Sequence, residues 1–528
     1  MTLDIAAGTS ITFPVAHDHP LSKAQSFRTP RLEDIAAHPN YSKVLEGRLI
    51  ELLATQALNE RMPQLQTELR TSPKRALNQS TASALSRVAV VVLLVASVGL
   101  NSPASLAKEG PKKWVASWAS SMQGAYVYSP PAPLDSPFHI YAINPDLRFA
   151  FPNATTDGAV EQTFRLIVKP DLFGEDYRLR FSNFFGTQAV TFKAISVAVQ
   201  DYAGNIIPGT LREVTFGRAA AVTIQPGKLV YSDGFRSPAD PDDPLLKGRN
   251  FAISFAVQGK SGPMTYHNSA FTTSYISPPN SGDHTEDIHD FAFSNSTTAV
   301  FFLDALDVIA SADTVVVCAF GASITEGTFS TINGNDRWSN DLSIRLHEAY
   351  GNKVSVVNEG IAGNTVVNPA FIGPAAVDRL DRDVLGLSGL TSVVWGDEGM
   401  NDFAAENNTA SAVIAGLQNG ISRMHAAGIK VVGATITSGL NATVLLNWGT
   451  PVTDAKRRAT NDFIRHSGLY DSVADMDTAT LDPGTGELKP EFVPDSSIGS
   501  PGDKLHLSRA GYQAMAETVD LRVLAPQR

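Results

Sequence analysis

Hydrophobic and polar residues alternate along several short runs between residues 114 and 308. In residues 177–182, the apolar side chains Tyr177, Leu179 and Phe181 are each followed by a polar residue, which is the period of a half-buried β-strand. Turns that contain Gly or Pro separate further runs of this kind, at residues 191–200, 220–226, 229–235 and 251–257. The pattern predicts a β-sandwich or jelly-roll-like domain over residues 108–312.

From residue 313 the pattern changes to buried strands that alternate with amphipathic helices. The unbroken apolar run TVVVCAF is typical of a parallel strand that is covered on both faces. Two helices are each expected to carry one apolar stripe, and Gly428 ends the second helix; the stripes are Trp338, Leu342, Leu346 and Ala349, and Val413, Leu417, Ile421 and Met424. The predicted fold class is α/β: a three-layer α/β/α domain with a five-stranded parallel sheet over residues 313–528.

The 528 residues allow roughly two to four domains, and the first 107 differ from the rest. The apolar run at residues 88–100 is shorter than the about 20 residues that span a bilayer, and basic residues precede it. Ser105 and Ala107 provide the small residues of an export cleavage site. We predict a signal peptide or anchor at residues 62–107, cleaved after Ala107 if it is a signal peptide, which leaves residues 1–61 as an N-terminal extension of doubtful status.

The export signal predicts a secreted or periplasmic protein. The alternative is an uncleaved, membrane-anchored form, and residues 88–100 would also allow a transient association with a membrane. The formal net charge of −11 and the lack of any run rich in Lys and Arg argue against nucleic acid as a partner. Cys318 is the only cysteine, which excludes an intramolecular disulfide and a Cys-based zinc site, and its apolar neighbours predict core packing.

Residues with catalytic chemistry follow the predicted parallel strands. Ser323 comes directly after the first strand, Gly363 after the second and Asn401 after the third, while Asp503 and His506 lie near the C-terminus. Loops at the carboxyl ends of parallel strands meet at one edge of the sheet, which is where ligands bind in open α/β sheets. We therefore expect these side chains to gather at one site.

Four segments resemble, in the same order, the four signature blocks of the GDSL/SGNH hydrolases; they are residues 321–325, 358–364, 398–402 and 503–506. The strings STINGNDRW and DEGMNDF, with WVASWA and RLRFSNFFG in the β-domain, are similar to a subgroup of arylesterase-like acylhydrolases that has an N-terminal β-domain. The sequence departs from the family at Ala322, where the family has Asp. This difference bears on the rigidity of the loop more than on the reaction.

The resemblance implies a role for each matching residue. Ser323 is the expected nucleophile, His506 its base and Asp503 the acid that orients the base. The expected oxyanion donors are the backbone N–H groups of Ser323 and Gly363 and the side-chain amide of Asn401. No metal and no organic cofactor is implied. Two alternatives stay open: Gly360 as the oxyanion glycine in place of Gly363, and a helix-capping role for Asn401.

The predicted function is the hydrolysis of carboxylic esters through an acyl-serine intermediate, on a small-molecule or polysaccharide ester. One alternative is acyl transfer to a sugar or another alcohol, which needs the same residues. The other is a non-catalytic polysaccharide-binding module. Candidate substrate-facing residues are Tyr266, His267 and residues 282–287 in the β-domain; Trp395, Phe403 and Trp448 are candidates for an acyl or aryl pocket.

Overall fold

The computed structural model divides the chain into two compact units, Met1–Lys108 and Glu109–Arg528. It describes residues 2–5, 9–12, 110–127, 147–240, 243, 246–443, 447–494 and 502–526. The predicted signal peptide or anchor at residues 62–107, including the apolar run at residues 88–100, lies outside the described residues, as does most of residues 1–61. In the first unit, β1 (Thr2–Ile5) pairs antiparallel with β2 (Thr9–Thr12).

No helix in the described part of the chain is long and apolar enough to cross a bilayer.

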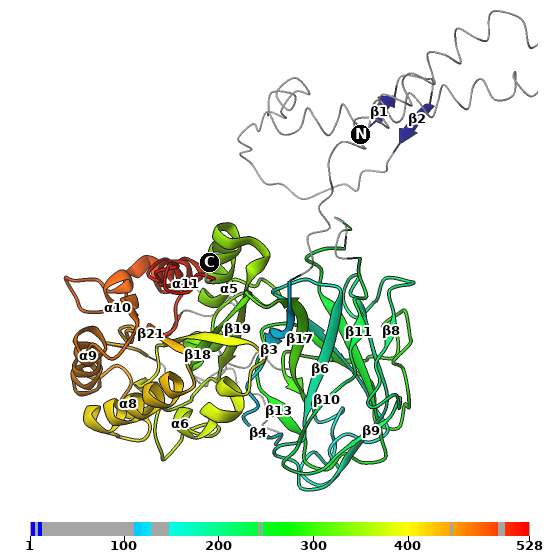
Figure 1. Ribbon diagram of the computed structural model, residues 1–528, viewed down its shortest axis with the longest axis horizontal. Coiled ribbons are helices and arrows are strands. Elements are labelled where there is room, and N and C mark those ends of the chain that lie inside the picture. The colour runs from blue at the N-terminus through cyan, green and yellow to red at the C-terminus, as the bar shows by residue number, and fades with distance from the viewer. Residues whose placement is uncertain are drawn as a thin grey trace, which may run out of the picture. The chain divides into compact units, whose positions relative to one another are not determined.

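The second unit begins with a β-rich region of antiparallel sheets (Figure 1). A five-stranded sheet has the order β10-β6-β17-β3, with β11 also paired to β6, and a seven-stranded sheet has the order β15-β14-β5-β12-β7-β8, with β9 paired to β7. A third sheet has the order β16-β13-β4. The strands are β3 (Lys112–Ala119), β4 (Gly124–Ala125), β5 (Thr163–Val168), β6 (Asp176–Ser182), β7 (Val190–Val199), β8 (Arg212–Glu213), β9 (Val222–Ile224), β10 (Leu229–Tyr231), β11 (Phe235–Arg236), β12 (Phe251–Gln258), β13 (Thr265–His267), β14 (Ser274–Ile276), β15 (Asn295–Thr297), β16 (Val300–Phe301) and β17 (Leu303–Ser311).

Aromatic side chains pack the two larger sheets against each other. The ring of Phe181 on β6 lies 5.3 Å from the ring of Phe192 on β7 and 5.3 Å from that of Phe255 on β12. These buried rings form the inner faces of the predicted sandwich, which the structure confirms. The alternation of apolar and polar residues along β6 predicts that its polar face is exposed to solvent. Arg180 on that face is instead buried and pairs with Asp304 at 2.7 Å.

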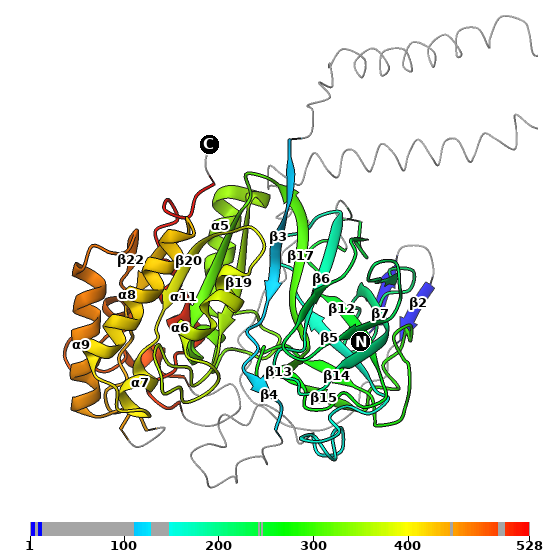
Figure 2. The ribbon, with the colours of Figure 1, turned by 60° about the horizontal axis from the view of Figure 1, so that its bottom comes forward.

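The rest of the unit contains the predicted five-stranded parallel sheet, in the order β19-β18-β20-β21-β22 (Figure 2). Its strands are β18 (Val315–Gly321), β19 (Val354–Gly360), β20 (Leu390–Gly396), β21 (Lys430–Ala434) and β22 (Ser472–Ala474). The helices are α4 (Ser323–Glu326), α5 (Trp338–Tyr350), α6 (Ala376–Arg379), α7 (Met400–Ala404), α8 (Ala410–Ala426), α9 (Pro451–His466), α10 (Met476–Thr480) and α11 (Arg509–Glu517), with the short 3-10 helices η2 (Gly351–Lys353) and η4 (Pro490–Phe492) and the π-helix η3 (Leu380–Leu385).

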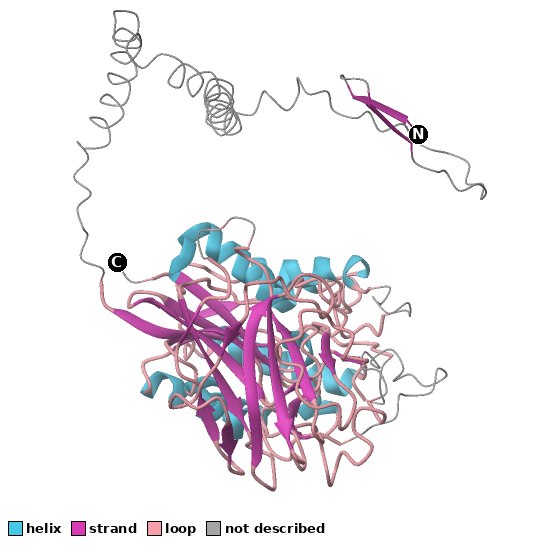
Figure 3. Ribbon diagram, turned by 90° about the vertical axis from the view of Figure 1, so that its right-hand side faces the viewer, coloured by secondary structure: helices cyan, strands magenta, loops and turns pink. Residues whose placement is uncertain are grey.

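Successive residues of β18 bury their side chains on opposite faces of this sheet. Val317 and Ala319 pack in one core with α5 and α11, whereas Cys318 and Phe320 pack in the other core with α6 and α8. Helices therefore cover both faces and form the three predicted layers (Figure 3). Of the predicted stripe on α5, only Ala349 is exposed, because it lies in the last turn of the helix beyond the edge of the core.

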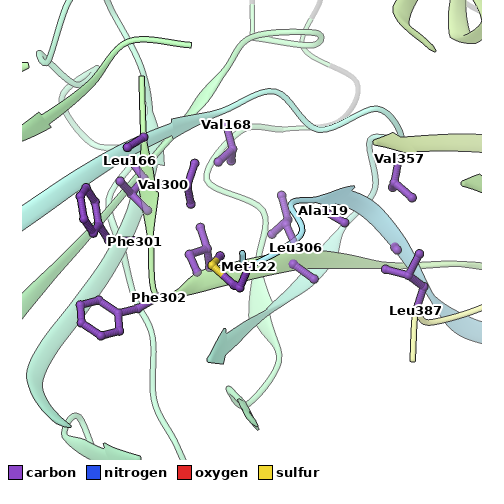
Figure 4. Close-up of a cluster of buried hydrophobic side chains, with 14 of the residues drawn as sticks. Ala119, Met122, Leu166, Val168, Val300, Phe301, Phe302, Leu306, Val357 and Leu387 are labelled. Atoms are coloured by element: carbon purple, nitrogen blue, oxygen red, sulfur yellow. The ribbon is translucent and has the colours of Figure 1, made fainter. Parts of the chain in front are cut away.

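The core of the β-rich region continues into the α/β region (Figure 4). Strand β3 lies along β19: the Ser355 hydroxyl donates to the Ala116 carbonyl at 2.7 Å, and the Ala116 N–H donates to the Ser388 carbonyl at 2.9 Å. Ala119 and Val357 belong to the same buried cluster. The β-rich region thus packs against the β19 edge of the parallel sheet.

We predict that Cys318 of the folded protein does not react with a thiol-specific disulfide reagent. The side chain is fully buried, and burial raises the pKa of the thiol well above its usual value, so almost no thiolate is present at neutral pH. The absorbance of the thiolate that the reagent releases measures the reaction of Cys318 alone, since the chain has one cysteine. Reaction should begin only as guanidinium unfolds the protein, and rapid labelling of the native protein would contradict this position for Cys318.

Candidate active site

The end of β18 places Ser323 at the edge of the sheet. The chain turns at the buried Ala322, and Ser323 begins α4. Gly321 allows this turn to lie close to β20, because a Cβ atom at Gly321 would be 2.2 Å from the Gly396 carbonyl oxygen. Ser323 is partly exposed, and its Oγ lies 2.8 Å from His506 Nε2.

His506 is held by Asp503 in the loop before α11. The Asp503 Oδ2 atom lies 2.5 Å from His506 Nδ1, and Oδ1 accepts the backbone N–H groups of Leu505 and His506 at 2.9 and 2.8 Å. A neutral His506 that donates its Nδ1 proton to this carboxylate presents Nε2 to Ser323 as an acceptor. Both Asp503 and His506 are buried, so water competes little for these contacts.

The structure distinguishes the two candidate oxyanion glycines. The Gly360 N–H already donates to Asn358 Oδ1 at 2.9 Å, and a Cβ at Gly360 would lie 2.2 Å from the Glu326 nitrogen, so this glycine serves close packing against α4. Gly363 has a φ of +76°, and its N–H has no acceptor among the described residues. Ser323 adds another open donor, since it is the first residue of a helix.

Asn401 lies inside α7, after Gly399 at the helix N-cap. Its Nδ2 donates one hydrogen to the Asn364 carbonyl at 2.8 Å, and its Oδ1 accepts from Trp448 Nε1 at 3.1 Å. These two contacts fix the amide and leave its second hydrogen available for a ligand. Asn401 Oδ1 accepts from Trp448 and not from a backbone N–H of α7, and Gly399 is the N-cap residue, so Asn401 does not cap this helix.

Buried carboxyl groups hold the loop that contains Gly363. Asp402 accepts the backbone N–H groups of Val366 and Val367 at 2.8 and 3.1 Å. Burial raises the pKa of Asp402 to about 7, although these two hydrogen bonds oppose the increase. Nothing in the sequence marked Asp402 as a loop anchor, because its partners lie more than 30 residues away.

Glu326 supports the same loop from the other side. Its Oε1 accepts the Ala362 N–H at 3.1 Å, next to Gly363, and lies 3.4 Å from His267 Nε2 on β13. Burial raises the pKa of Glu326 to about 8 and lowers the pKa of His267 to about 4, so both groups are neutral at pH 7. His267 therefore contacts Glu326 of α4 rather than Ser323.

Arg379 joins the loops around the site. Its buried guanidinium donates to Asn364 Oδ1 at 2.8 Å and to the Gly321 carbonyl at 3.0 Å. It also donates to the Glu359 carbonyl and to the Ser121 hydroxyl, each at 2.8 Å. The segments before Ser323 and after Gly363 thus share one donor group.

Other predicted residues occupy different positions. Trp395 and Phe403 belong to the core rather than to a pocket, and Tyr266 packs against Tyr126 and other aromatic rings of the β-rich region. In residues 282–287, the contacts are to neighbouring strands and loops, such as the bond from the His284 N–H to Thr163. Within the part of the chain that the structure describes, no cluster of three or more His, Cys, Asp or Glu side chains could hold a metal ion.

Known proteins provide an independent comparison. Residues 319–514 match the model of the GDSL-like lipase/acylhydrolase family, whereas a search of curated proteins finds no match. Similar solved structures include a lipase/acylhydrolase from Enterococcus faecalis (21% identity, 41% of this chain and 100% of that chain, TM-score 0.32). Another is a GDSL-like lipase from Bacteroides thetaiotaomicron (20% identity, 40% of this chain and 88% of that chain, TM-score 0.29). A third is a carbohydrate acetylesterase from Sinorhizobium meliloti (16% identity, 38% of this chain and 94% of that chain, TM-score 0.29).

The matched residues run from within β18 into α11 and include Ser323, Gly363, Asn401, Asp503 and His506. The name of the family indicates ester hydrolysis in general terms. Residues 319–514 thus contain a domain that matches the GDSL-like lipase/acylhydrolase family.

Proposed function

We propose that the protein hydrolyses carboxylic esters through an acyl enzyme formed on Ser323. The observation that carries this proposal is the continuous contact from Ser323 Oγ to His506 Nε2 at 2.8 Å and from His506 Nδ1 to Asp503 at 2.5 Å. A serine hydroxyl becomes a useful nucleophile when a base within hydrogen-bond reach removes its proton. The open N–H donors next to Ser323 supply the second requirement of acyl transfer, a site for the oxyanion.

In the acylation step, Ser323 Oγ attacks the ester carbonyl carbon while its proton moves to His506 Nε2. The carbonyl π electrons move to oxygen, and the resulting oxyanion accepts hydrogen bonds from the N–H groups of Ser323 and Gly363 and from Asn401 Nδ2. When the tetrahedral intermediate collapses, the bond to the alcohol oxygen breaks. The alkoxide leaves with the proton from His506, and the acyl group stays on Ser323.

Deacylation repeats these events with water as the nucleophile. His506 removes a proton from water, the hydroxide oxygen adds to the acyl carbon, and the intermediate expels Ser323 Oγ, which recovers the proton. The products are a carboxylic acid and the regenerated enzyme. Asp503 keeps its negative charge throughout and stabilises the imidazolium that forms in each half-reaction.

We also propose that this hydrolase is exported. The apolar run at residues 88–100, the basic residues before it and the small residues Ser105 and Ala107 support this location. The substrate would then be an ester outside the cytoplasm, either a small molecule or a group on a polysaccharide.

Replacement of Ser323 by Ala should lower kcat for short-chain p-nitrophenyl esters by at least about 10³-fold, because it removes the nucleophile and leaves the oxyanion donors in place. Absorbance of released p-nitrophenol measures the rate, and circular dichroism checks folding. Ser411→Ala is the matched control, since Ser411 is an exposed residue of α8. A folded Ser323→Ala protein with wild-type kcat would refute the acyl-Ser323 mechanism.

The Asp503→Asn substitution should lower kcat by about 10²–10⁴-fold and change KM little, because the amide keeps the size of the carboxyl group but not its charge. The amide can also stabilise the His506 tautomer that carries its proton on Nε2. Asp462→Asn is the control: Asp462 pairs with His466 at 2.9 Å on the surface of α9. Equal kcat values for Asp503→Asn and the control would show that Asp503 does not orient the base.

A further inference from the structure

A cavity lies between the β-rich region and the α/β region. It has a volume of about 490 Å³ and is lined by β3, the loop between β5 and β6, β13, α4, one side of α5, and β19. Trp118 and Phe173 contribute aromatic surface, whereas Ser120, Glu326, Arg337 and Asn340 contribute polar groups. None of the proposed catalytic and oxyanion residues lines it, so this cavity is separate from the site at Ser323. Its size falls within the range of about 300–1,000 Å³ that is typical of small-molecule sites.

The charged group of Arg337 is only partly satisfied by the protein. Its Nε donates to Asn340 Oδ1 at 2.9 Å, and its Nη1 makes a long contact of 3.5 Å with the Glu326 carbonyl. No carboxylate oxygen of the described residues lies within ion-pair distance of this half-buried guanidinium, and its Nη2 has no acceptor among them. Buried or half-buried arginine side chains are normally paired, because removing an unpaired charge from water is costly.

The other titratable groups of the cavity make no ion pair with Arg337, although the charges of Glu326 and Asp336 act on it from a greater distance. Burial raises the pKa of Glu326 to about 8, so its side chain is neutral at pH 7. Asp171 is already engaged by His347 at 3.0 Å, and by the Val356 N–H at 2.7 Å. His267 is neutral, while Lys169 and Glu348 are exposed residues of opposite charge at the rim. The balance favours a negatively charged ligand beside Arg337.

We propose that this cavity binds an organic carboxylate with an aromatic or otherwise apolar body. The carboxylate accepts hydrogen bonds from the free guanidinium edge of Arg337 and from Asn340 Nδ2, which has no acceptor among the described residues. The planar guanidinium suits the two oxygens of a carboxylate. The body of the ligand packs against Trp118 and Phe173, so a free anion such as phosphate fits the cavity less well.

Isothermal titration calorimetry of the full chain with benzoate and with benzamide tests this proposal. The two probes have the same size, and only benzoate is charged. Benzoate should bind with a dissociation constant in the micromolar to millimolar range, as expected for so small a ligand, and benzamide should bind at least about tenfold more weakly.

The sharpest variant is Asn340→Asp. It keeps the acceptor for Arg337 Nε and gives the guanidinium a carboxylate partner, so it should weaken benzoate binding at least about tenfold. An acidic residue in the first turn of α5 also suits the helix dipole, so folding should be preserved or improved. Arg337→Gln should cause the same loss of binding. Circular dichroism melting curves check the folding of both variants.

Two controls locate the binding site. Arg458→Gln removes an exposed arginine of α9 outside the cavity, and Asn401→Ala removes a proposed oxyanion donor; both should leave the benzoate affinity within about twofold of wild type. Loss of binding in Asn401→Ala would place benzoate in the catalytic site and overturn the proposal. Equal affinity of wild type and Asn340→Asp, equal binding of benzamide, or no binding of benzoate would each overturn it as well.

Discussion

The buried guanidinium of Arg379 is the interaction on which the geometry of the candidate site depends. It reaches the end of β18 at Gly321, the end of β19 at Glu359 and the loop that follows Gly363. The guanidinium also lies over the ring of Phe320 on β18, with its carbon atom 4.3 Å from the ring centroid, and this cation–π contact helps to hold Arg379 against the strand. Leaving a buried charged group without a hydrogen-bond partner is costly, so these bonds favour the observed positions of the loops. Ser323 and Gly363 are thereby fixed relative to each other.

The β-rich region takes part in this arrangement. Its Ser121 hydroxyl accepts a hydrogen bond from Arg379 at 2.8 Å and donates one to the Glu359 carboxyl group. Its His267 lies against Glu326, which in turn binds the Ala362 N–H beside Gly363. A preorganised oxyanion site needs rigid donors, and both contacts add rigidity from outside the sheet. The region thus has a structural reason to accompany the hydrolase fold even without a substrate contact of its own.

The sequence predicted what depends on local pattern. Strand ends located Ser323 and Asn401, and the resemblance to the signature blocks implied the contact between Asp503 and His506, which the structure shows at 2.5 Å. It missed the supports that depend on long-range packing, since Arg379 and Ser121 are 258 residues apart. The burial of Arg180 was missed for the same reason. The choice between Gly360 and Gly363 required the hydrogen-bond partner of each backbone N–H, which the sequence does not give. Helical periodicity alone could not show that the core ends before Ala349.

The central claim is that His506 activates Ser323 at a prepared oxyanion site. Covalent labelling by a fluorophosphonate tests it directly, because this reagent reacts with an activated serine and mimics the tetrahedral intermediate. Mass spectrometry of proteolytic peptides should find the label on Ser323 alone in the wild-type protein, and no label in a folded His506→Ala variant. A label on a different serine, or equally fast labelling of Ser323 without His506, would contradict the account.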